Sequence, residues 1–309
     1  MLETVVNIIN STLRMTTPIA FVGLGAVLSE KAGINALAME GIMLMGSFGA
    51  VLGSYLTNSA WVGVLCGMLW SAAMSLTRGI LSINLNANQT LTGVGTNIMA
   101  SGLTALLIRI IWGVDGKSAP VNSLSAVKLP LISEIPVIGP IVGYQNPLVL
   151  LLFPCLIGLW FLLSKTKFGL RVTVAGEKPE VLGSLGINVA KYRYLALLLS
   201  GLVSGLGGAY LSLGQLSFFI SDMTSGRGYM ALAACIFGGW APVGTFFGSL
   251  LFGFAETIQT RLQSVSTFAE YSQFVQMIPY VLTVIVLAGM VRKQISPPSA
   301  LGKPYEEQV

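Results

Sequence analysis

Long apolar stretches without charge recur along most of this chain, and they restrict the fold more than any other feature. Only 9% of the 309 residues are charged, and the mean hydropathy is +0.79. A soluble domain keeps roughly a quarter of its residues charged, whereas a helix that crosses a bilayer needs about 20 mainly apolar residues. The runs therefore predict an all-α polytopic membrane protein, with 1–309 forming a single transmembrane domain.

We expect eight or nine crossings, because the run 229–239 is too short to cross alone. A glycine-containing break separates it from 243–262, which predicts broken helices near the membrane midplane. Residues 2–10 are predicted to form a short amphipathic segment on the membrane surface, a lead-in to the first crossing. Residues 113–146, which include four prolines, are predicted to form an extracytoplasmic loop. The expected crossings are 11–28, 36–56, 61–77, 89–112, 147–164, 194–213, 229–239 with 243–262, and 274–291.

Basic residues gather in one polar stretch, 165–193, which holds six of them. Cytoplasmic connections carry an excess of Lys and Arg, so we expect 165–193 to be cytoplasmic. Five crossings precede it, which places the N-terminus outside and the C-terminus in the cytoplasm. The net charge of +5 is then explained by orientation and not by nucleic-acid binding. The other inner basic residues would be Lys31, Arg78, Arg292, Lys293 and Lys303, against Lys117, Lys128, Arg227 and Arg261 outside.

The residue types needed for most catalytic and metal sites are missing. The chain has no histidine, and Cys66, Cys155 and Cys235 are scattered through apolar segments. This excludes a Ser-His-Asp arrangement and predicts neither a metal site nor a disulfide framework. We expect a protein that is not an enzyme and binds no cofactor of its own. The N-terminal residues also lack the basic region of a cleaved signal peptide.

A short helix is predicted inside the basic stretch 165–193. Pro179 suits the first position of a helix, Glu180 complements the helix dipole, and Gly186 is a typical C-terminal stop. Such a helix could lie on anionic lipid or insert into a cytoplasmic partner, and its periodicity alone does not decide between them. Its apolar face is expected to comprise Val181, Leu182 and Leu185.

Two segments share the pattern Gly-x-x-Ala-Leu-Ala, at 33–38 and 228–233. On the topology above, the turn before the first lies inside and the turn before the second lies outside. This arrangement is typical of an inverted repeat, which many transporters use to build a midplane pathway. Chance similarity among common residues is the alternative.

Several motifs together resemble one family. The runs "TKFGLR" at 166–171, "AGEKP" at 175–179 and "LGIN" at 185–188 resemble the cytoplasmic loop of bacterial ABC-importer permeases for ribose-type sugars and nucleosides. "SEKAGINALAMEGIMLMGSFGA" at 29–50 is similar to an early signature of the nucleoside branch. "RGYMALAACIFGGWAPVGTFFGSLLFGFAE" at 227–256 is similar to its late signature.

This resemblance implies a transmembrane permease of the bacterial cell membrane whose 165–193 loop carries a coupling helix for a cytoplasmic ABC ATPase. ATP and Mg²⁺ would be bound by that ATPase. It also implies a second permease subunit. A heterodimer is favoured, because the chain lacks the extra N-terminal helix of the longer permeases; a homodimer is the alternative. An extracytoplasmic binding lipoprotein would deliver the substrate. The implied ATPase-coupling residues are Gly176, Glu177, Pro179, Glu180, Val181, Leu182, Leu185 and Gly186.

Polar or backbone-breaking residues inside the apolar runs are candidates for the substrate pathway. Glu40 needs a partner or a wet cavity, because a carboxylate at the centre of a membrane helix is costly; bonds to backbone donors near Gly41 are the alternative. The polar residues of the fourth run could equally hold helices together, and Trp240 could stack on a nucleobase or simply pack. The pathway candidates are Glu40, Thr92, Thr96, Asn97, Gly238, Gly239, Trp240 and Pro242.

Three functions remain open. The first, which the resemblance implies, is an ATP-driven importer permease for a nucleoside or for a simple sugar. An ion-coupled secondary transporter of a small polar solute is the alternative, although such carriers usually need several ionisable groups in the membrane. A scaffold without transport is the third, and the broken helices argue against it.

Overall fold

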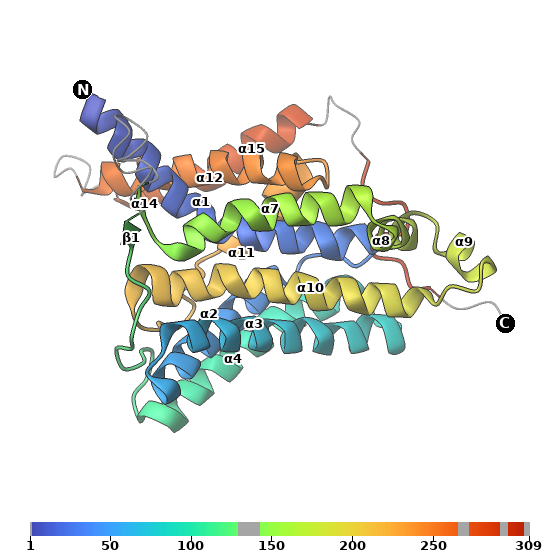
Figure 1. The fold of residues 1–309 in the computed structure, drawn as a ribbon, viewed down its shortest axis with the longest axis horizontal. Helices are drawn as coiled ribbons and strands as arrows, with labels where there is room; N and C mark the ends of the chain where they lie inside the picture. Colours follow the sequence, from blue (N-terminus) through green and yellow to red (C-terminus); the bar gives the residue numbers. More distant parts are fainter. Residues whose placement is uncertain (1, 129–142, 265–271, 291–295, 306–309) are drawn as a thin grey trace.

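The computed structural model describes residues 2–128, 143–264, 272–290 and 296–305, and these residues are mostly helical (Figure 1). Two short strands, β1 (Val127–Lys128) and β2 (Tyr144–Gln145), pair antiparallel with Val127 opposite Gln145. The helices are α1 (Leu2–Lys31), α2 (Met39–Thr57), α3 (Ala60–Gly79), α4 (Gln89–Trp112), α7 (Pro147–Lys165), α8 (Lys167–Glu177), α9 (Pro179–Ser184), α10 (Val189–Ala209), α11 (Arg227–Phe237), α12 (Pro242–Gln263), α14 (Ser272–Gln276) and α15 (Ile278–Met290). Two π-helical segments, η1 (Ile80–Asn84) and η2 (Tyr210–Leu216), continue α3 and α10.

Six helices in the described part of the chain are long and apolar enough to cross a membrane: α1, α2, α3 with η1, α4, α7, and α10 with η2. Each corresponds to a predicted run, and α4 has the predicted bounds 89–112. The first run is longer than predicted. Residues 2–10 do not form a separate lead-in but are the beginning of α1, because nothing interrupts the helix before Lys31.

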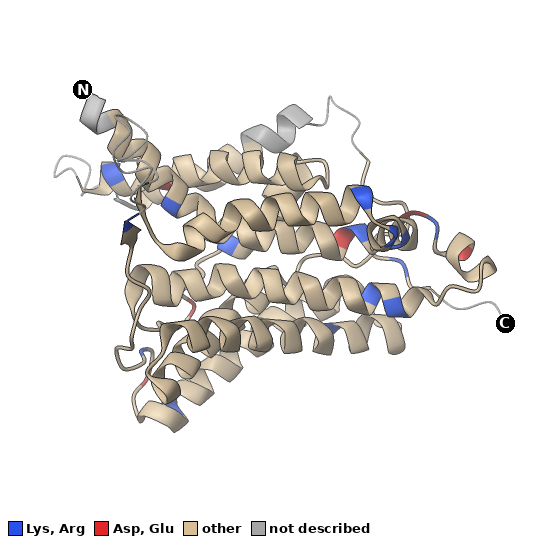
Figure 2. Ribbon diagram, viewed as in Figure 1, with Lys and Arg blue, Asp and Glu red and all other residues tan. Residues whose placement is uncertain are grey.

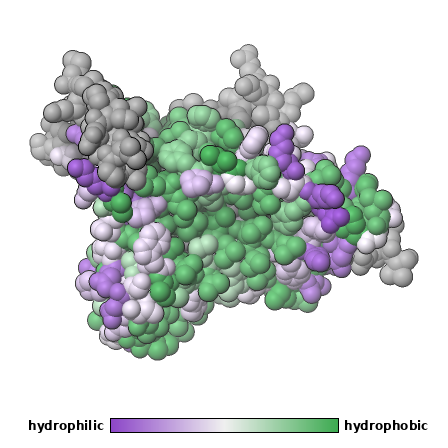
Figure 3. Space-filling model, in the orientation of Figure 1, coloured by the Kyte–Doolittle hydropathy of each residue, from purple (hydrophilic) through white to green (hydrophobic). Residues whose placement is uncertain are grey.

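Several of the long helices, among them α3, α7 and α10, run along the long axis of the molecule (Figure 1). Helices α8 and α9 lie at one end, whereas β1, α14 and the start of α1 lie at the other. Charged residues gather mainly at the two ends (Figure 2). The face between them is largely apolar (Figure 3). This distribution is the one expected for a bundle whose middle lies in hydrocarbon and whose ends lie in water.

The centre of the bundle is held together by small residues. Gly201 and Gly205 of α10 pack against α3, where an added Cβ would come within 2.6 Å of the Cα atoms of Ala72 and Met68. Serine hydroxyls also bond across helices: Ser75 Oγ donates to the Leu197 carbonyl at 2.8 Å. Small residues let helix backbones approach closely in membranes. The α10 glycines therefore serve close helix packing.

The predicted outer loop covers one end of the bundle. Asn122 donates to the Asn58 carbonyl and accepts, through its own carbonyl, from Ser54 of α2. The backbone N–H of Leu124 donates to Leu213 in η2 at 2.9 Å. Asn122 and Leu124 are thereby fixed on the ends of α2 and η2, and Asn146 Nδ2 donates to the Leu124 carbonyl at 2.9 Å. Residues 129–142 of the loop lie outside the described residues.

Two interruptions divide the helices near the predicted positions. Residues 32–38 separate α1 from α2, and residues 238–241 separate α11 from α12. The two similar sequence segments adopt different conformations, however. Gly33 has φ +84° in the turn after α1, whereas Gly228 lies inside the first turn of α11.

Candidate functional site

Residues on the two sides of the unwound segment 32–38 bond to the two ends of α11. An 11-residue helix such as α11 spans about 16 Å. Glutamates flank the unwound segment on both sides, at Glu30 and Glu40. Each carboxylate reaches a different end of α11.

Glu40 caps the beginning of α11. Its Oε1 accepts from the backbone N–H of Gly226 at 2.8 Å, and its Oε2 accepts from that of Gly228 at 2.7 Å. Carboxylates are favoured at helix N-termini because the first N–H groups have no partner within the helix. An added Cβ at Gly228 would collide with the Glu40 backbone, so only glycine allows this approach. The Glu40 carboxylate therefore does accept hydrogen bonds from backbone N–H groups, as one of the two interpretations of the sequence expected. The donors belong to the start of α11, however, and not to residues near Gly41.

Glu30 holds the other end. It is 2% exposed, and it accepts from the indole N–H of Trp240 through Oε2 and from the backbone N–H of Ala36 through Oε1 at 3.1 Å. Trp240 is itself buried, in a left-handed conformation with φ +55°, immediately after Gly239 with φ +61°. Trp240 therefore connects residues 238–241, which follow α11, to Glu30 of α1 through a hydrogen bond, and its ring is buried within the protein.

A buried arginine accompanies this pair. Arg78, at the end of α3, is fully buried, and its guanidinium makes no hydrogen bond among the described residues. Glu30 is near enough to attract it electrostatically. Neither charge was singled out from the sequence, because a single Glu or Arg at the end of an apolar run looks like an ordinary surface residue.

The polar residues of α4 divide into two groups. The hydroxyls of Thr92 and Thr96 bond within their own helix, Thr92 also meeting Ser82, and Thr96 is buried. Asn97 instead reaches other elements. Its Oδ1 accepts from the Gly41 backbone N–H at 2.8 Å, and its Nδ2 donates to the Leu37 carbonyl and the Tyr229 hydroxyl. Asn97 thus joins α4 to the start of α2 and to α11.

Of the other pathway candidates, Gly238 and Pro242 form the rest of the break after α11. Gly238 packs directly on Gly244 at the start of α12, and Pro242 occupies the first position of that helix. The break lies beside Glu30, next to the last residue of α1, and not beside Asn97. Glu40, Asn97 and Trp240 are therefore brought onto one structure, the frame around α11, while Thr92 and Thr96 are not.

The stretch 165–193 contains two short helices, α8 and α9, where one was predicted. Helix α9 begins at Pro179, as predicted, and Gly186 adopts φ +68° after its end. The predicted single apolar face is divided. Leu182 is buried against Ala175 and Val189, whereas Val181 and Leu185 are 46% and 68% exposed. Glu180 is also exposed, while Pro179 and Gly176 are buried.

Helix α8 joins this region to the unwound segment. Gly176, in its last turn, packs backbone to backbone on the turn after α1, where an added Cβ would come within 2.8 Å of the Gly33 nitrogen. Glu177 accepts from the backbone N–H and hydroxyl of Ser299 at 3.1 and 2.9 Å. Of the predicted coupling residues, Gly176, Pro179 and Leu182 are therefore packed on the rest of the protein and Glu177 bonds to Ser299, whereas the others are exposed: Glu180, Val181, Leu185 and Gly186.

Comparison with known proteins identifies the family. The model of the family described as "Branched-chain amino acid transport system / permease component" matches residues 8–287. The chain belongs to this family. It is 36% identical to the nucleoside ABC transporter permease protein NupC of Lactococcus lactis, over 94% of each chain. It is also 36% identical to the guanosine ABC transporter permease protein NupQ of Bacillus subtilis, over 96% of each. The Haloferax volcanii permease protein TsgC13, named for a glucose ABC transporter, is 30% identical over 98% of each.

Solved structures agree with the fold. PsaBC from Streptococcus pneumoniae aligns with a TM-score of 0.51 and 12% identity over 92% of this chain and 94% of the other. An inward-facing ABC transporter described as metal-chelate type aligns with a TM-score of 0.50 and 15% identity over 91% and 85%. The prediction of a multi-pass ABC-importer permease subunit is therefore confirmed, and the ion-coupled carrier is not.

Proposed function

We propose that this permease subunit moves a nucleoside from an extracytoplasmic binding protein into the cytoplasm, driven by a separate ATPase that binds ATP and Mg²⁺. The observation that carries the substrate class is the 36% identity, over almost the whole chain, to two permeases named for nucleoside and guanosine transport. A simple sugar is the second candidate, supported by the relative named for glucose transport. We further propose a heterodimer with a second permease subunit.

The test is reconstitution of the complete complex in liposomes with its cognate binding protein. Uptake of labelled nucleoside should require ATP and should stop when the ATPase is inactivated. A binding screen on the cognate binding protein, with nucleosides against pentoses and hexoses, decides the substrate. Selective binding of a hexose would replace the nucleoside with a sugar, and uptake by the isolated chain on an ion gradient alone would overturn ATP-driven import.

The topology that fits this function has the N-terminus outside and α8, α9 and the C-terminus in the cytoplasm. The start of α1 lies at one end of the bundle, whereas α8, α9 and the C-terminal residues 296–305, which bond to α8, lie at the other (Figure 1). Ends on opposite sides require an odd number of crossings, which favours nine over eight, with α11 as the shortest. Cysteine at the exposed position of Leu185, in a background without Cys66, Cys155 and Cys235, should react with an impermeant maleimide only from the cytoplasmic side. Reaction only from outside would reverse the topology.

The exposed part of α9 is the proposed contact with the ATPase. Val181 and Leu185 are exposed beside the polar residues Glu180 and Ser184, and apolar groups exposed next to a polar rim mark interaction sites. Leu185→Asp should leave the permease folded but lower both ATPase binding and uptake. Leu182→Asp, which buries a charge, should instead lower thermal stability. Normal uptake in Leu185→Asp would show that this surface of α9 is not the contact with the ATPase.

Four polar residues on one exposed face are the proposed lining of the pathway, and we refer to them as the polar strip. Asn97 meets Tyr229, and Ser101 Oγ donates to Asp222 Oδ1 at 2.7 Å. Asp222 and Tyr229 are exposed. Asn97 and Ser101 lie in the middle of α4. An exposed carboxylate beside the middle of a membrane-crossing helix faces a water-filled cavity or a partner, because hydrocarbon excludes it.

The polar strip extends the predicted pathway set, which included Asn97 but missed Ser101, Asp222 and Tyr229. Asp222→Asn and Tyr229→Phe should each lower uptake, since hydroxyl-rich substrates need matching donors and acceptors. Thr77→Val is the matched control, because the exposed Thr77 hydroxyl bonds only its own helix. Wild-type uptake kinetics in both polar-strip variants would place the pathway elsewhere.

A further inference from the structure

The C-terminal residues 296–305 lie across the junction between α8, α9 and the unwound segment, and we refer to them as the strap. The strap has no helix or strand of its own. It is nevertheless held by backbone bonds to two separate elements. Ala300 N–H donates to the Gly176 carbonyl of α8 at 2.8 Å, and Gly302 N–H donates to the Gly33 carbonyl at 3.2 Å.

Side chains reinforce the attachment. Ser299 bonds Glu177 at the end of α8. Tyr305 packs on the small apolar cluster that buries Leu182 of α9, together with Ala175 and Val189. The strap therefore touches α8, α9 and the turn that leads into the unwound segment, and it does so within seven residues.

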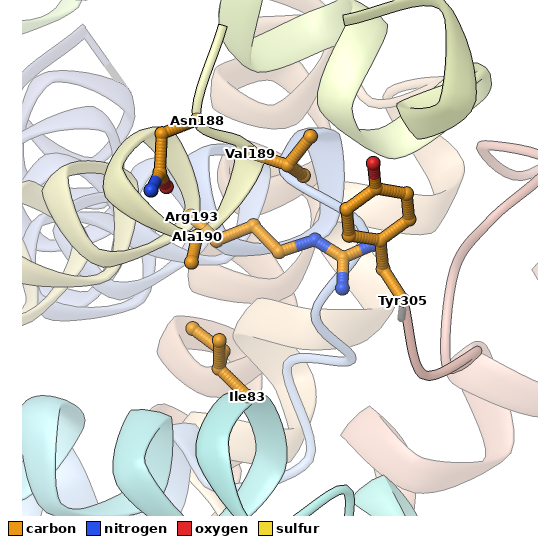
Figure 4. A pocket seen from close by; sticks show the side chains of 6 residues that line it. All are labelled: Ile83, Asn188, Val189, Ala190, Arg193 and Tyr305. Atoms are coloured by element: carbon orange, nitrogen blue, oxygen red, sulfur yellow. The ribbon is translucent and has the colours of Figure 1, made fainter. Parts of the chain in front are cut away.

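Tyr305 also lies next to the buried side chain of Arg193. The Arg193 guanidinium lies 6.0 Å from the centre of the Tyr305 ring, within reach of a cation–π attraction, and Arg193 is only 2% exposed. Figure 4 shows the Tyr305 ring beside the Arg193 side chain, both among the residues that line a small pocket together with Asn188, Val189 and Ile83. Arg193 donates to the Ala175 carbonyl of α8 at 3.4 Å. The ring thus links the strap to both α8 and the start of α10.

We propose that Tyr305 is a positioning residue, through which the strap makes α8, α9 and the turn at Gly33 move together. Displacement of α9 by an ATPase is then transmitted to the unwound segment, and from there through Glu30 and Glu40 to α11. This rests on the proposed function, since it assumes that α9 contacts the ATPase. Without the strap, α9 would still present Val181 and Leu185, but its movement would be transmitted less completely.

The test measures uptake and ATP hydrolysis together in the reconstituted complete complex, using the ligand that the cognate binding protein carries. Tyr305→Ala should leave ATPase binding and hydrolysis near the wild-type level and lower uptake per ATP about three- to tenfold, the range expected for a coupling residue. Tyr305→Phe should restore uptake per ATP, because it keeps the ring. Lys303→Ala, at an exposed strap position, is the matched control and should behave as wild type.

Three results would overturn the inference. Uptake per ATP in Tyr305→Ala could equal wild type, Tyr305→Phe could be as defective as Tyr305→Ala, or Tyr305→Ala could lose the ATPase altogether, which would make Tyr305 a docking residue. If Tyr305→Ala does not fold, Ser299→Ala tests the same attachment through the strap's bond to Glu177, and wild-type uptake per ATP there would count against the strap. Failure of the proposed function is distinguishable, because the wild-type complex itself would then show no ATP-dependent uptake.

Discussion

Glu30 and Glu40 flank the same unwound segment and hold opposite ends of one short helix, but their surroundings differ. Glu30 is almost fully buried, accepts from an indole and one backbone N–H, and lies near the unpaired guanidinium of Arg78. Glu40 is half-buried and accepts from two backbone N–H groups at the start of α11. Burial makes Glu30 costly to lose, whereas Glu40 is partly open to solvent.

Removing Glu30 should have the largest effect. Glu30→Ala leaves the Trp240 indole N–H and the Ala36 backbone N–H without their buried acceptor, at about 1–3 kcal/mol each, and removes the negative charge that attracts Arg78. We expect a large fall in the thermal stability of the purified permease. The double variant Glu30→Gln with Arg78→Met should recover much of it, and Glu180→Ala, at an exposed position, should change nothing. Equal stability of Glu30→Ala and wild type would mean that the two charges do not interact.

Removing Glu40 should have a smaller and more local effect. Glu40→Ala deprives two backbone donors of a charged acceptor, but Glu40 is only half-buried, so water can take its place and the total loss should be about 1.5–3 kcal/mol. Amide hydrogen exchange in residues 226–230 should become faster, with little change in α3 and α10. Unchanged exchange in 226–230 would show that Glu40 does not stabilise the start of α11.

Trp240→Phe should cost less than either. It removes one hydrogen bond to Glu30 but keeps an aromatic ring, so the loss of stability should be about 1–3 kcal/mol, the cost of a buried acceptor left without its donor. Thermal unfolding measures this directly. If substrate affinity fell while stability stayed constant, Trp240 would contact the nucleobase, contrary to its position in the structure.

Thr96→Val should have the smallest effect, since the Thr96 hydroxyl bonds only the carbonyl of Thr92 in its own helix. We expect unchanged uptake and a change in unfolding free energy below about 0.5 kcal/mol. A strong loss of uptake would indicate that Thr96 lines the substrate pathway after all. It would also contradict the distinction between residues that bond to α11 and residues that bond only within α4.

Local patterns in the sequence predicted the helices well. The apolar run 89–112 matches α4, and Pro179 marks the start of α9, because hydropathy and helix-start preferences are properties of neighbouring residues. Pairings between distant residues were not predictable in this way. Nothing near Glu30 indicates that it will meet Trp240, 210 positions further along the chain.

The strap and the divided face of α9 show the same limit. Residues 296–305 follow no helical or strand period, and their order comes from bonds to Gly176 and Gly33. Likewise, Val181, Leu182 and Leu185 are similar in the sequence, and only packing on Ala175 and Val189 buries Leu182. The motifs identified the family, but the way in which Glu30 and Glu40 of the early signature segment hold the two ends of α11 in the late one required the structure.

The central claim is that α11 follows the unwound segment because Glu40 holds its first turn. The most direct test is uptake per ATP hydrolysed in the complete reconstituted complex carrying Glu40→Gln, which keeps the size of the side chain but replaces one acceptor oxygen with a donor. The account predicts a folded complex that hydrolyses ATP but moves markedly less substrate for each ATP. Wild-type uptake per ATP in that variant would contradict it.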